Sequence, residues 1–169
     1  MEFVLLAPGP SMSQSLADSF KGQHVGVVNN CYELAPWADF LAANDVKWWV
    51  KNPEAKMFHG KRYTANRVDK VERIQGGMVS PNLNSGVLAL ECAKRAGATT
   101  IYLYGFDMHG THYFGSYTNG LGTTTVASRK RHHVQYAKWA TLNPAVRVIN
   151  CTPGSALTCF PFAQDCIAA

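Results

Sequence analysis

The strand–helix–strand pattern of the first 30 residues constrains the fold more than any other feature of this sequence. The segment FVLLAPG (3–9) is a short apolar run that ends in Pro-Gly, which is typical of a buried strand. Ser11 or Ser13 can cap the amphipathic helix that follows and ends at Gly22, and HVGVVNN (24–30) predicts a second strand. Two strands joined through a helix pair in parallel with a right-handed crossover. We therefore expect an α/β protein.

The same alternation continues along the chain. We expect the further elements at these positions: a strand at 39–43, a helix from Asn44 or Asp45, a helix at 85–97, a strand at 100–106, a helix at 128–142 and a strand at 146–150. Residues 51–83 are less regular, and FHGKRYTA and VERIQGG within them are either short strands or edge pieces. The pattern predicts a three-layer, Rossmann-like α/β sandwich with a mostly parallel sheet, in a single domain over residues 1–169.

The composition indicates a globular protein without a membrane span. Hydrophobic residues make up 47% of the 169 residues and charged residues 16%, which excludes an intrinsically disordered chain. No apolar run reaches the roughly 18 residues that a membrane helix needs. The start MEFVLLAPGPS carries an acidic residue and a short apolar run, so we interpret it as a strand rather than a signal peptide. The expected location is the cytoplasm.

Cysteines and histidines do not show the spacing of a metal site. No C-x-x-C pair occurs, and we expect reduced, mostly core-filling thiols at Cys31, Cys92, Cys151, Cys159 and Cys166. His109 and His112 lie three residues apart, but no third ligand of fitting spacing stands nearby. We therefore predict no metal and no bound cofactor other than a nucleotide-type ligand.

The charge balance favours an anionic partner. The net charge is +5, from 16 Lys and Arg against 11 Asp and Glu, which suits a nucleotide, a phosphosugar or a nucleic acid. The basic run SRKRHHVQYAK (128–138) is either a solvated helix face or a nucleic-acid contact. The sequence contains neither G-x-G-x-x-G nor G-x-x-x-x-G-K-[ST], which disfavours NAD and P-loop nucleotide binding.

Small and polar residues follow several of the predicted strands. Ligands of open parallel sheets bind beyond the carboxyl ends of the strands, so these residues are expected to converge on one rim. The candidates are Gly9-Pro10-Ser11, Asn29-Asn30, Asn44-Asp45, Asn84-Ser85-Gly86 and Gly105-Phe106-Asp107. Helix starts among them offer N–H groups to a phosphate or carboxylate, and asparagines can contact a base or ribose. Each triplet taken alone is also compatible with an ordinary turn or helix cap.

The region after the best strand adds a loop and a histidine pair. Residues 108–127 form a long loop rich in glycine, threonine and aromatic residues, which is typical of a lid or binding loop. Its aromatic residues Tyr113, Phe114 and Tyr117 either close over a substrate or pack on a second subunit of a homo-oligomer. One of His132 and His133 can aim into the site as a general base, or both are exposed on a basic helix.

Several motifs resemble those of a known family. LLAPGPSM, VVNNCYEL, NSGVLALECAKRAGATTIYLYGFDM and a histidine four residues before Tyr136 occur in this order. They resemble the motifs of small, metal-independent bacterial sialyltransferases of glycosyltransferase family 42. With APWAD and INCTPGSALTCFP included, nearly the whole chain resembles small phage-encoded members of this superfamily, which act in the host cytoplasm.

The resemblance implies roles for individual residues. The nucleotide phosphate would be lined by Gly9, Pro10 and Ser11, and the nucleotide would be contacted by Asn29 or Asn30. The anionic part of the donor would be held by Ser85 with Asn84 and Gly86. Asp107 would lie at the ribose or base edge. His132 would be the catalytic base, with His133 as the alternative. The chain is shorter than those transferases and its loop after Asp107 differs, so the resemblance does not identify the acceptor.

Three functions follow as hypotheses. The first is a glycosyltransferase-like enzyme that uses a nucleotide-activated donor and, in agreement with the absence of an Asp-x-Asp motif, no metal. The second is a non-catalytic protein that binds or sequesters a nucleotide. The third is a nucleic-acid-binding module built on the basic helix 128–138.

Overall fold

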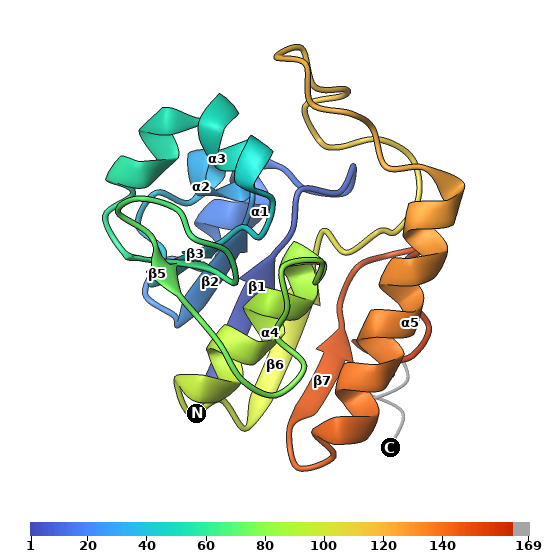
Figure 1. Ribbon diagram of the computed structural model, residues 1–169. Coiled ribbons are helices and arrows are strands. Elements are labelled where there is room, and N and C mark those ends of the chain that lie inside the picture. The colour runs from blue at the N-terminus through green and yellow to red at the C-terminus, as the bar shows by residue number, and fades with distance from the viewer. Residues whose placement is uncertain (164–169) are drawn as a thin grey trace.

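The computed structural model describes residues 1–163, which form one seven-stranded sheet with the strand order β5-β4-β3-β2-β1-β6-β7 (Figure 1). Every neighbouring pair in it is parallel. The strands are β1 (Glu2–Leu6), β2 (Val25–Val28), β3 (Phe40–Ala42), β4 (Lys61–Thr64), β5 (Glu72–Arg73), β6 (Thr100–Tyr104) and β7 (Arg147–Asn150). The predicted α/β sandwich is confirmed, and the sheet is parallel throughout its described strands rather than mostly parallel.

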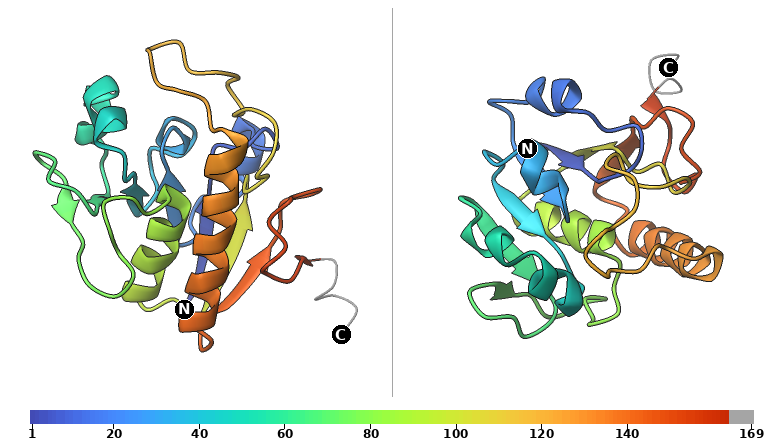
Figure 2. Two further views of the ribbon diagram at one scale, coloured as in Figure 1. Left: turned by 45° about the vertical axis from the view of Figure 1, so that its right-hand side comes forward. Right: turned by 90° about the horizontal axis from the view of Figure 1, so that it is seen from above.

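Helices cover both faces of the sheet and make it the middle of three layers (Figures 1 and 2). The helices are α1 (Gln14–Asp18), α2 (Cys31–Leu34), α3 (Val46–Lys51), the 3-10 turn η1 (Pro53–Met57), α4 (Ser85–Arg95) and α5 (Val126–Leu142). Residues of α4 and α5 share one core cluster with alternate side chains of β1 and β6, and residues of α1, α2, α3 and η1 share the other. Burial on both faces explains why the central strands read as continuous apolar runs.

Most predicted elements are found close to their expected positions. Ser13, rather than Ser11, caps α1, and its hydroxyl accepts from the N–H of Leu16. The final helix begins at Val126, with Thr125 as its cap, two residues before the predicted start. The irregular region contributes the edge strand β5 and its neighbour β4. The short elements α2 and η1 were not predicted, because four or five residues are too few to show a helical period.

The cysteines and the membrane prediction have simple structural counterparts. Cys31 and Cys92 are buried in the two cores, where burial raises the pKa of both thiols, and Cys159 is exposed. Cys166 lies outside the described residues. Within residues 1–163, no helix combines the length and the apolar character needed to cross a membrane.

The strand order reverses direction next to β1. From β1 the chain builds outward through β2, β3, β4 and β5, and it then returns to add β6 and β7 on the other side of β1. The loops that leave β1 and β6 therefore diverge and leave a crevice at their carboxyl ends, which is where open α/β sheets bind ligands.

Candidate functional site

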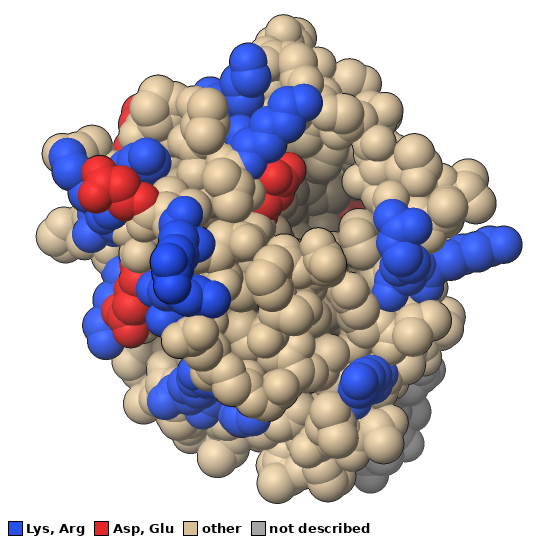
Figure 3. Space-filling model, viewed as in Figure 1, with Lys and Arg blue, Asp and Glu red and all other residues tan. Residues whose placement is uncertain are grey.

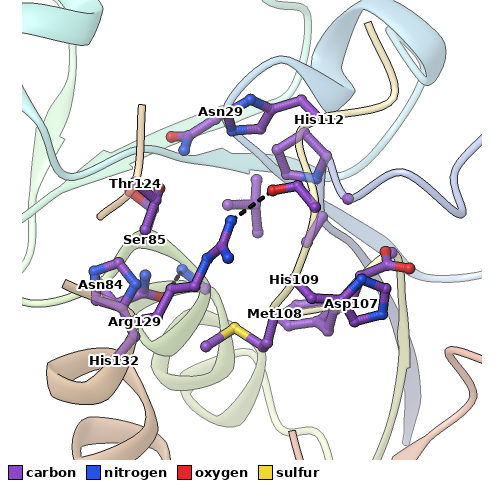
Figure 4. Close-up of a pocket in the computed structure, with 18 of the residues that line it drawn as sticks. Asn29, Asn84, Ser85, Asp107, Met108, His109, His112, Thr124, Arg129 and His132 are labelled. Carbon is purple, nitrogen blue, oxygen red and sulfur yellow. Dashed lines mark hydrogen bonds between the residues drawn. The ribbon is translucent and has the colours of Figure 1, made fainter. Parts of the chain in front are cut away.

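A cleft lies in the crevice beyond β1 and β6. Two adjoining cavities, of about 170 Å³ and about 540 Å³, form it. Six residues line both cavities and make the cleft continuous: Asn29, Asn84, Ser85, His112, Thr124 and His132. Figure 3 shows the hollow on this face, and Figure 4 shows the side chains around it. Its size suits a small organic ligand of the nucleotide class.

Most residues predicted from the sequence meet in this cleft. The larger cavity is lined by Asp45. The smaller cavity is lined by Gly9, Asn29, Asn84, Ser85, Gly86, Gly105, Phe106, Asp107 and His132. Neither cavity is lined by Pro10, Ser11, Asn30 or His133. The contacts of the individual residues explain this division.

The Gly-Pro-Ser turn after β1 is closed by a carboxylate. The Ser11 hydroxyl donates to Oδ2 of Asp107 at 2.8 Å, and Asp107 is buried. A Cβ atom on Gly9 would collide with the same carboxylate oxygen. Pro10 and Ser11 do not line the cleft, and Ser11 instead holds the turn after β1 against the turn after β6, so the structure gives no support to their predicted contact with a phosphate.

The start of α4 is capped by its own side chains. Oδ1 of Asn84 accepts from the N–H of Gly86 at 2.8 Å and from the N–H of Val87 at 3.3 Å. The hydroxyl of Tyr136 donates to the same oxygen at 2.8 Å. The predicted use of Asn84 and Gly86 as free donors for an anion is thus not supported, since the chain already satisfies these groups. Asn84 instead joins α4 to α5.

Ser85 keeps a hydrogen bond to offer to a ligand. Its Oγ accepts from the backbone N–H of Asn44 at 3.0 Å, which fixes the side chain at the boundary of the two cavities. A hydroxyl that accepts in this way still has its own hydrogen to donate. Asn44 is buried, and Asp45 caps α3 by accepting from the N–H of Lys47.

Asn29 and Asn30 have different roles. Oδ1 of Asn30 accepts from the indole of Trp48 at 2.8 Å and from the hydroxyl of Tyr117 at 3.2 Å, while Nδ2 donates to Glu33. Its backbone oxygen accepts from the hydroxyl of Tyr113. Asn30 is therefore an anchor of the neighbouring loop and lines neither cavity, so these contacts do not support its predicted contact with the nucleotide. Asn29 is the asparagine that faces the cleft.

The loop between β6 and α5 is held down beside the cleft. It projects beyond the carboxyl ends of the strands (Figures 1 and 2). Besides the two tyrosine contacts to Asn30, the N–H of Tyr113 donates to the backbone oxygen of Pro8 at 3.1 Å. Within the loop, the rings of His112 and Phe114 stack with centroids 4.8 Å apart. These contacts fix the first half of the loop and bring His112 to the cleft wall.

Helix α5 contributes a histidine and an arginine to the cleft. Arg129, His132 and Tyr136 are spaced as i, i+3 and i+7, so they share one helix face. Burial lowers the pKa of His132, and the charges of Arg131 and His133 lower it further. His132 is therefore neutral at neutral pH and able to accept a proton. The structure separates the two predicted histidines, because His133 does not line the cleft.

Arg129 is the site residue that the sequence reasoning missed. Its guanidinium donates to the backbone oxygen of Gly110 and lines the smaller cavity (Figure 4). The sequence reasoning assigned it to a basic run that is solvated or contacts nucleic acid. Its position three residues before His132 was the available indication, since both residues then lie on one helix face.

The described residues contain no cluster of three or more His, Cys, Asp or Glu side chains that could hold a metal ion. His109 and His112 diverge in their contacts. His109 hydrogen-bonds through Nε2 to the backbone oxygen of Gly154, whereas His112 stacks within the loop.

Comparison with protein-family models, with curated proteins and with solved structures found no match to this chain, so its similarity to family 42 glycosyltransferases stays a prediction from its motifs.

Proposed function

We propose that this protein is a glycosyltransferase-like enzyme that binds a nucleotide-activated donor in the cleft and transfers the donor's sugar-like group to an acceptor hydroxyl. The observation that supports this proposal most directly is the position of His132, a neutral histidine that lines both cavities. The cleft lies at the reversal point of a parallel sheet, where nucleotides bind in such folds. The sequence motifs that resemble family 42 agree with this proposal.

The proposed reaction is a direct displacement. His132 accepts the proton of the acceptor hydroxyl while the hydroxyl oxygen forms a bond to the anomeric carbon. The bond from that carbon to the phosphate oxygen breaks, and the nucleotide leaves with the electron pair. The Arg129 guanidinium and the Ser85 hydroxyl are two donors in the cleft that can stabilise the charge on the leaving phosphate.

A non-catalytic nucleotide-binding protein is the alternative, and one observation favours it. The Gly-Pro-Ser turn and the start of α4 use their polar groups internally, through the Ser11–Asp107 and Asn84–Gly86 contacts. Fewer donors are therefore left to stabilise a leaving group than the sequence motifs imply. A nucleic-acid-binding role is less favoured, because Arg129 of the basic run turns into the cleft.

Paired histidine variants distinguish the two leading functions. We would follow nucleotide release from a panel of CMP- and UDP-sugars, and donor affinity by calorimetry, in wild type, His132→Ala and His133→Ala. A transferase loses turnover in His132→Ala, retains donor affinity and is unaffected by His133→Ala. A protein that binds nucleotides without turning over any donor is the non-catalytic binder. If no nucleotide or nucleotide sugar binds the wild type, both functions are excluded.

A further inference from the structure

Two polar atoms in the cleft are buried and have no partner. They are Oδ1 of Asn29 and Nδ1 of His112, each without a hydrogen bond in the structure of residues 1–163. A buried polar atom left unpaired costs about 1–3 kcal/mol, so each such atom calls for a partner such as a water or a ligand. Both side chains line both cavities of the cleft. The two side chains therefore combine a place in the cleft wall with an unpaired polar atom behind it.

The anchors of the loop bring these two residues together. Tyr113, which follows His112, donates through its hydroxyl to the backbone oxygen of Asn30, the residue after Asn29. Its N–H also donates to Pro8 at the end of β1. Figure 4 shows Asn29 and His112 on the same side of the pocket, away from His132 in that view. The end of β2 and the loop thus supply one polar group each to the same wall.

The backbone at Asn29 supports a role beyond packing. Asn29 has a φ of +45°, a left-handed conformation that asparagine tolerates better than most residues. Its side-chain amide makes no hydrogen bond in the described structure, so one acceptor and two donors are available. The His112 ring is oriented by its stack on Phe114, with an interplanar angle of 1°. The pair is therefore positioned by the protein but unsatisfied.

The chemistry of the pair differs from that of Arg129, whose guanidinium reaches the same loop at Gly110. An amide and a neutral imidazole present donors and acceptors without charge, whereas Arg129 presents a cation. Burial lowers the pKa of His112 and the charge of Arg129 lowers it further, while the backbone of Gly115 opposes them in part, and the net effect favours the neutral ring. An uncharged group that carries its own donor and acceptor fits the pair. The edge of a nucleobase and the N-acyl group of a sugar both have this pattern.

We propose that Asn29 and His112 form a specificity subsite that reads an amide-type donor–acceptor group of the ligand, while Arg129 binds its phosphate. This inference rests on the proposed function, since it assigns the uncharged and charged parts of a nucleotide-type ligand to different residues. His112 is then the residue through which the loop selects the ligand.

Two pairs of probes test the subsite by calorimetry. The first pair is the tightest-binding nucleoside monophosphate of a panel of four and ribose 5-phosphate, which lacks the base. The second is N-acetylglucosamine 1-phosphate and glucose 1-phosphate, which lacks the acyl group. His112→Phe retains the stack on Phe114 and removes both nitrogens, and Asn29→Gly removes the amide without backbone strain. His59→Phe is the matched control, because His59 is exposed and lines neither cavity.

The expected result is a loss of discrimination rather than of phosphate binding. In wild type we expect one of two results: the nucleoside monophosphate binds more tightly than ribose 5-phosphate, or N-acetylglucosamine 1-phosphate binds more tightly than glucose 1-phosphate. The first result identifies the group that the subsite reads as the nucleobase, and the second identifies it as the N-acyl group of the sugar. His112→Phe and Asn29→Gly each reduce that advantage by about three- to tenfold and leave the partner's Kd unchanged. His59→Phe changes neither value.

Failure of the subsite and failure of the proposed function give different results. If the phosphate probes bind but the advantage is absent in wild type, or survives in both variants, the subsite is wrong and nucleotide binding stands. If no probe binds wild type, the proposed function itself is excluded. Circular dichroism melts establish that each variant folds, and Asn29→Ser or His112→Leu, which also remove the amide or the imidazole without adding a charge, replaces a variant that does not.

Discussion

At the scale of single residues, close approaches shape the floor of the cleft. A Cβ atom on Gly9 would collide with Asp107, one on Gly86 with the hydroxyl of Tyr136, and one on Gly105 with the backbone oxygen of Ala7. The ends of β1, α4 and β6 can therefore meet only where glycine stands. The position of the cleft depends on these contacts as well as on the sheet.

Replacement of Gly86 by alanine tests this packing. The added methyl group displaces Tyr136 from Asn84, so we expect a loss of about 1–3 kcal/mol in the free energy of unfolding. Gly122→Ala is the matched control, since its Cβ would meet no atom within 4 Å. Urea denaturation measures the free energy of unfolding of both variants. Equal values for the two would show that the collision between the added methyl group and Tyr136 does not destabilise the protein.

The decrease of kcat/KM at low pH tests the assignment of His132 as the general base. A general base must be neutral, and the pKa of His132 is lowered from its ordinary value of 6.5 by burial and by the charges of Arg131 and His133. We therefore expect kcat/KM to stay high as the pH falls to 6.5 and to decline only below that value. A decline centred above pH 6.5 would contradict the assignment of His132 as the base.

The sequence predicted which residue types surround the cleft but not which of them are already paired. Polar residues after strands were expected to converge because parallel strands end on one edge. The partners of Ser11 and Asn84 are Asp107 and Tyr136, which lie 96 and 52 residues away in the chain. Contacts of this range depend on side-chain geometry, and no local pattern encodes them. For the same reason the sequence left Asn29 and Asn30 as alternatives.

At the scale of elements, the loop between β6 and α5 is the least regular part of the site. The hydroxyls of Tyr113 and Tyr117 fasten it to Asn30, and the contact of Arg129 with Gly110 fastens it to α5. Its length and composition predicted a binding loop, but not these anchors. Whether its aromatic residues also meet a second subunit stays a prediction.

Removal of the two tyrosine hydroxyls tests the anchoring of the loop. In the double variant Tyr113→Phe/Tyr117→Phe, both hydrogen bonds to Asn30 are lost while the ring contacts remain. We expect amide hydrogen exchange over residues 108–125 to become faster by about tenfold. Tyr102→Phe is the control, because its hydroxyl contacts Glu2 at the start of β1, away from the loop. Unchanged exchange in the double variant would show that other contacts hold the loop.

At the scale of the whole molecule, the fold follows from the alternation of apolar strands and amphipathic helices. The first strand–helix–strand unit already implied parallel pairing, and the later elements extended it. The order of the strands was not predicted, because placing β6 beside β1 rather than beside β5 depends on long-range packing. Strands β4 and β5 were ambiguous, since both are short, β5 is exposed and half of β4 is only partly buried.

Global stability is expected to fall in mild acid. The pKa values of His112 and His132 are lowered in the folded state, mainly by burial, so the unfolded chain binds more protons between the two states' pKa values. The free energy of unfolding therefore declines as the pH falls from 7 through 6.5, and it levels off below the folded-state pKa values. Denaturation at several pH values measures this, and His112→Phe/His132→Gln should flatten the slope. A slope unchanged in that variant would assign the decline to other groups.

Calorimetric titration of two neighbouring variants tests the central claim, that the cleft beyond β1 and β6 binds a nucleotide-type ligand. Arg129 turns into the cleft, whereas Lys130 beside it on α5 is exposed and lines neither cavity. With the nucleotide that stabilises wild type most in a thermal-shift panel, Arg129→Gln should weaken binding by roughly ten- to a hundredfold and Lys130→Gln by less than about twofold. Equal effects of the two substitutions, or no nucleotide binding by wild type, would contradict the account.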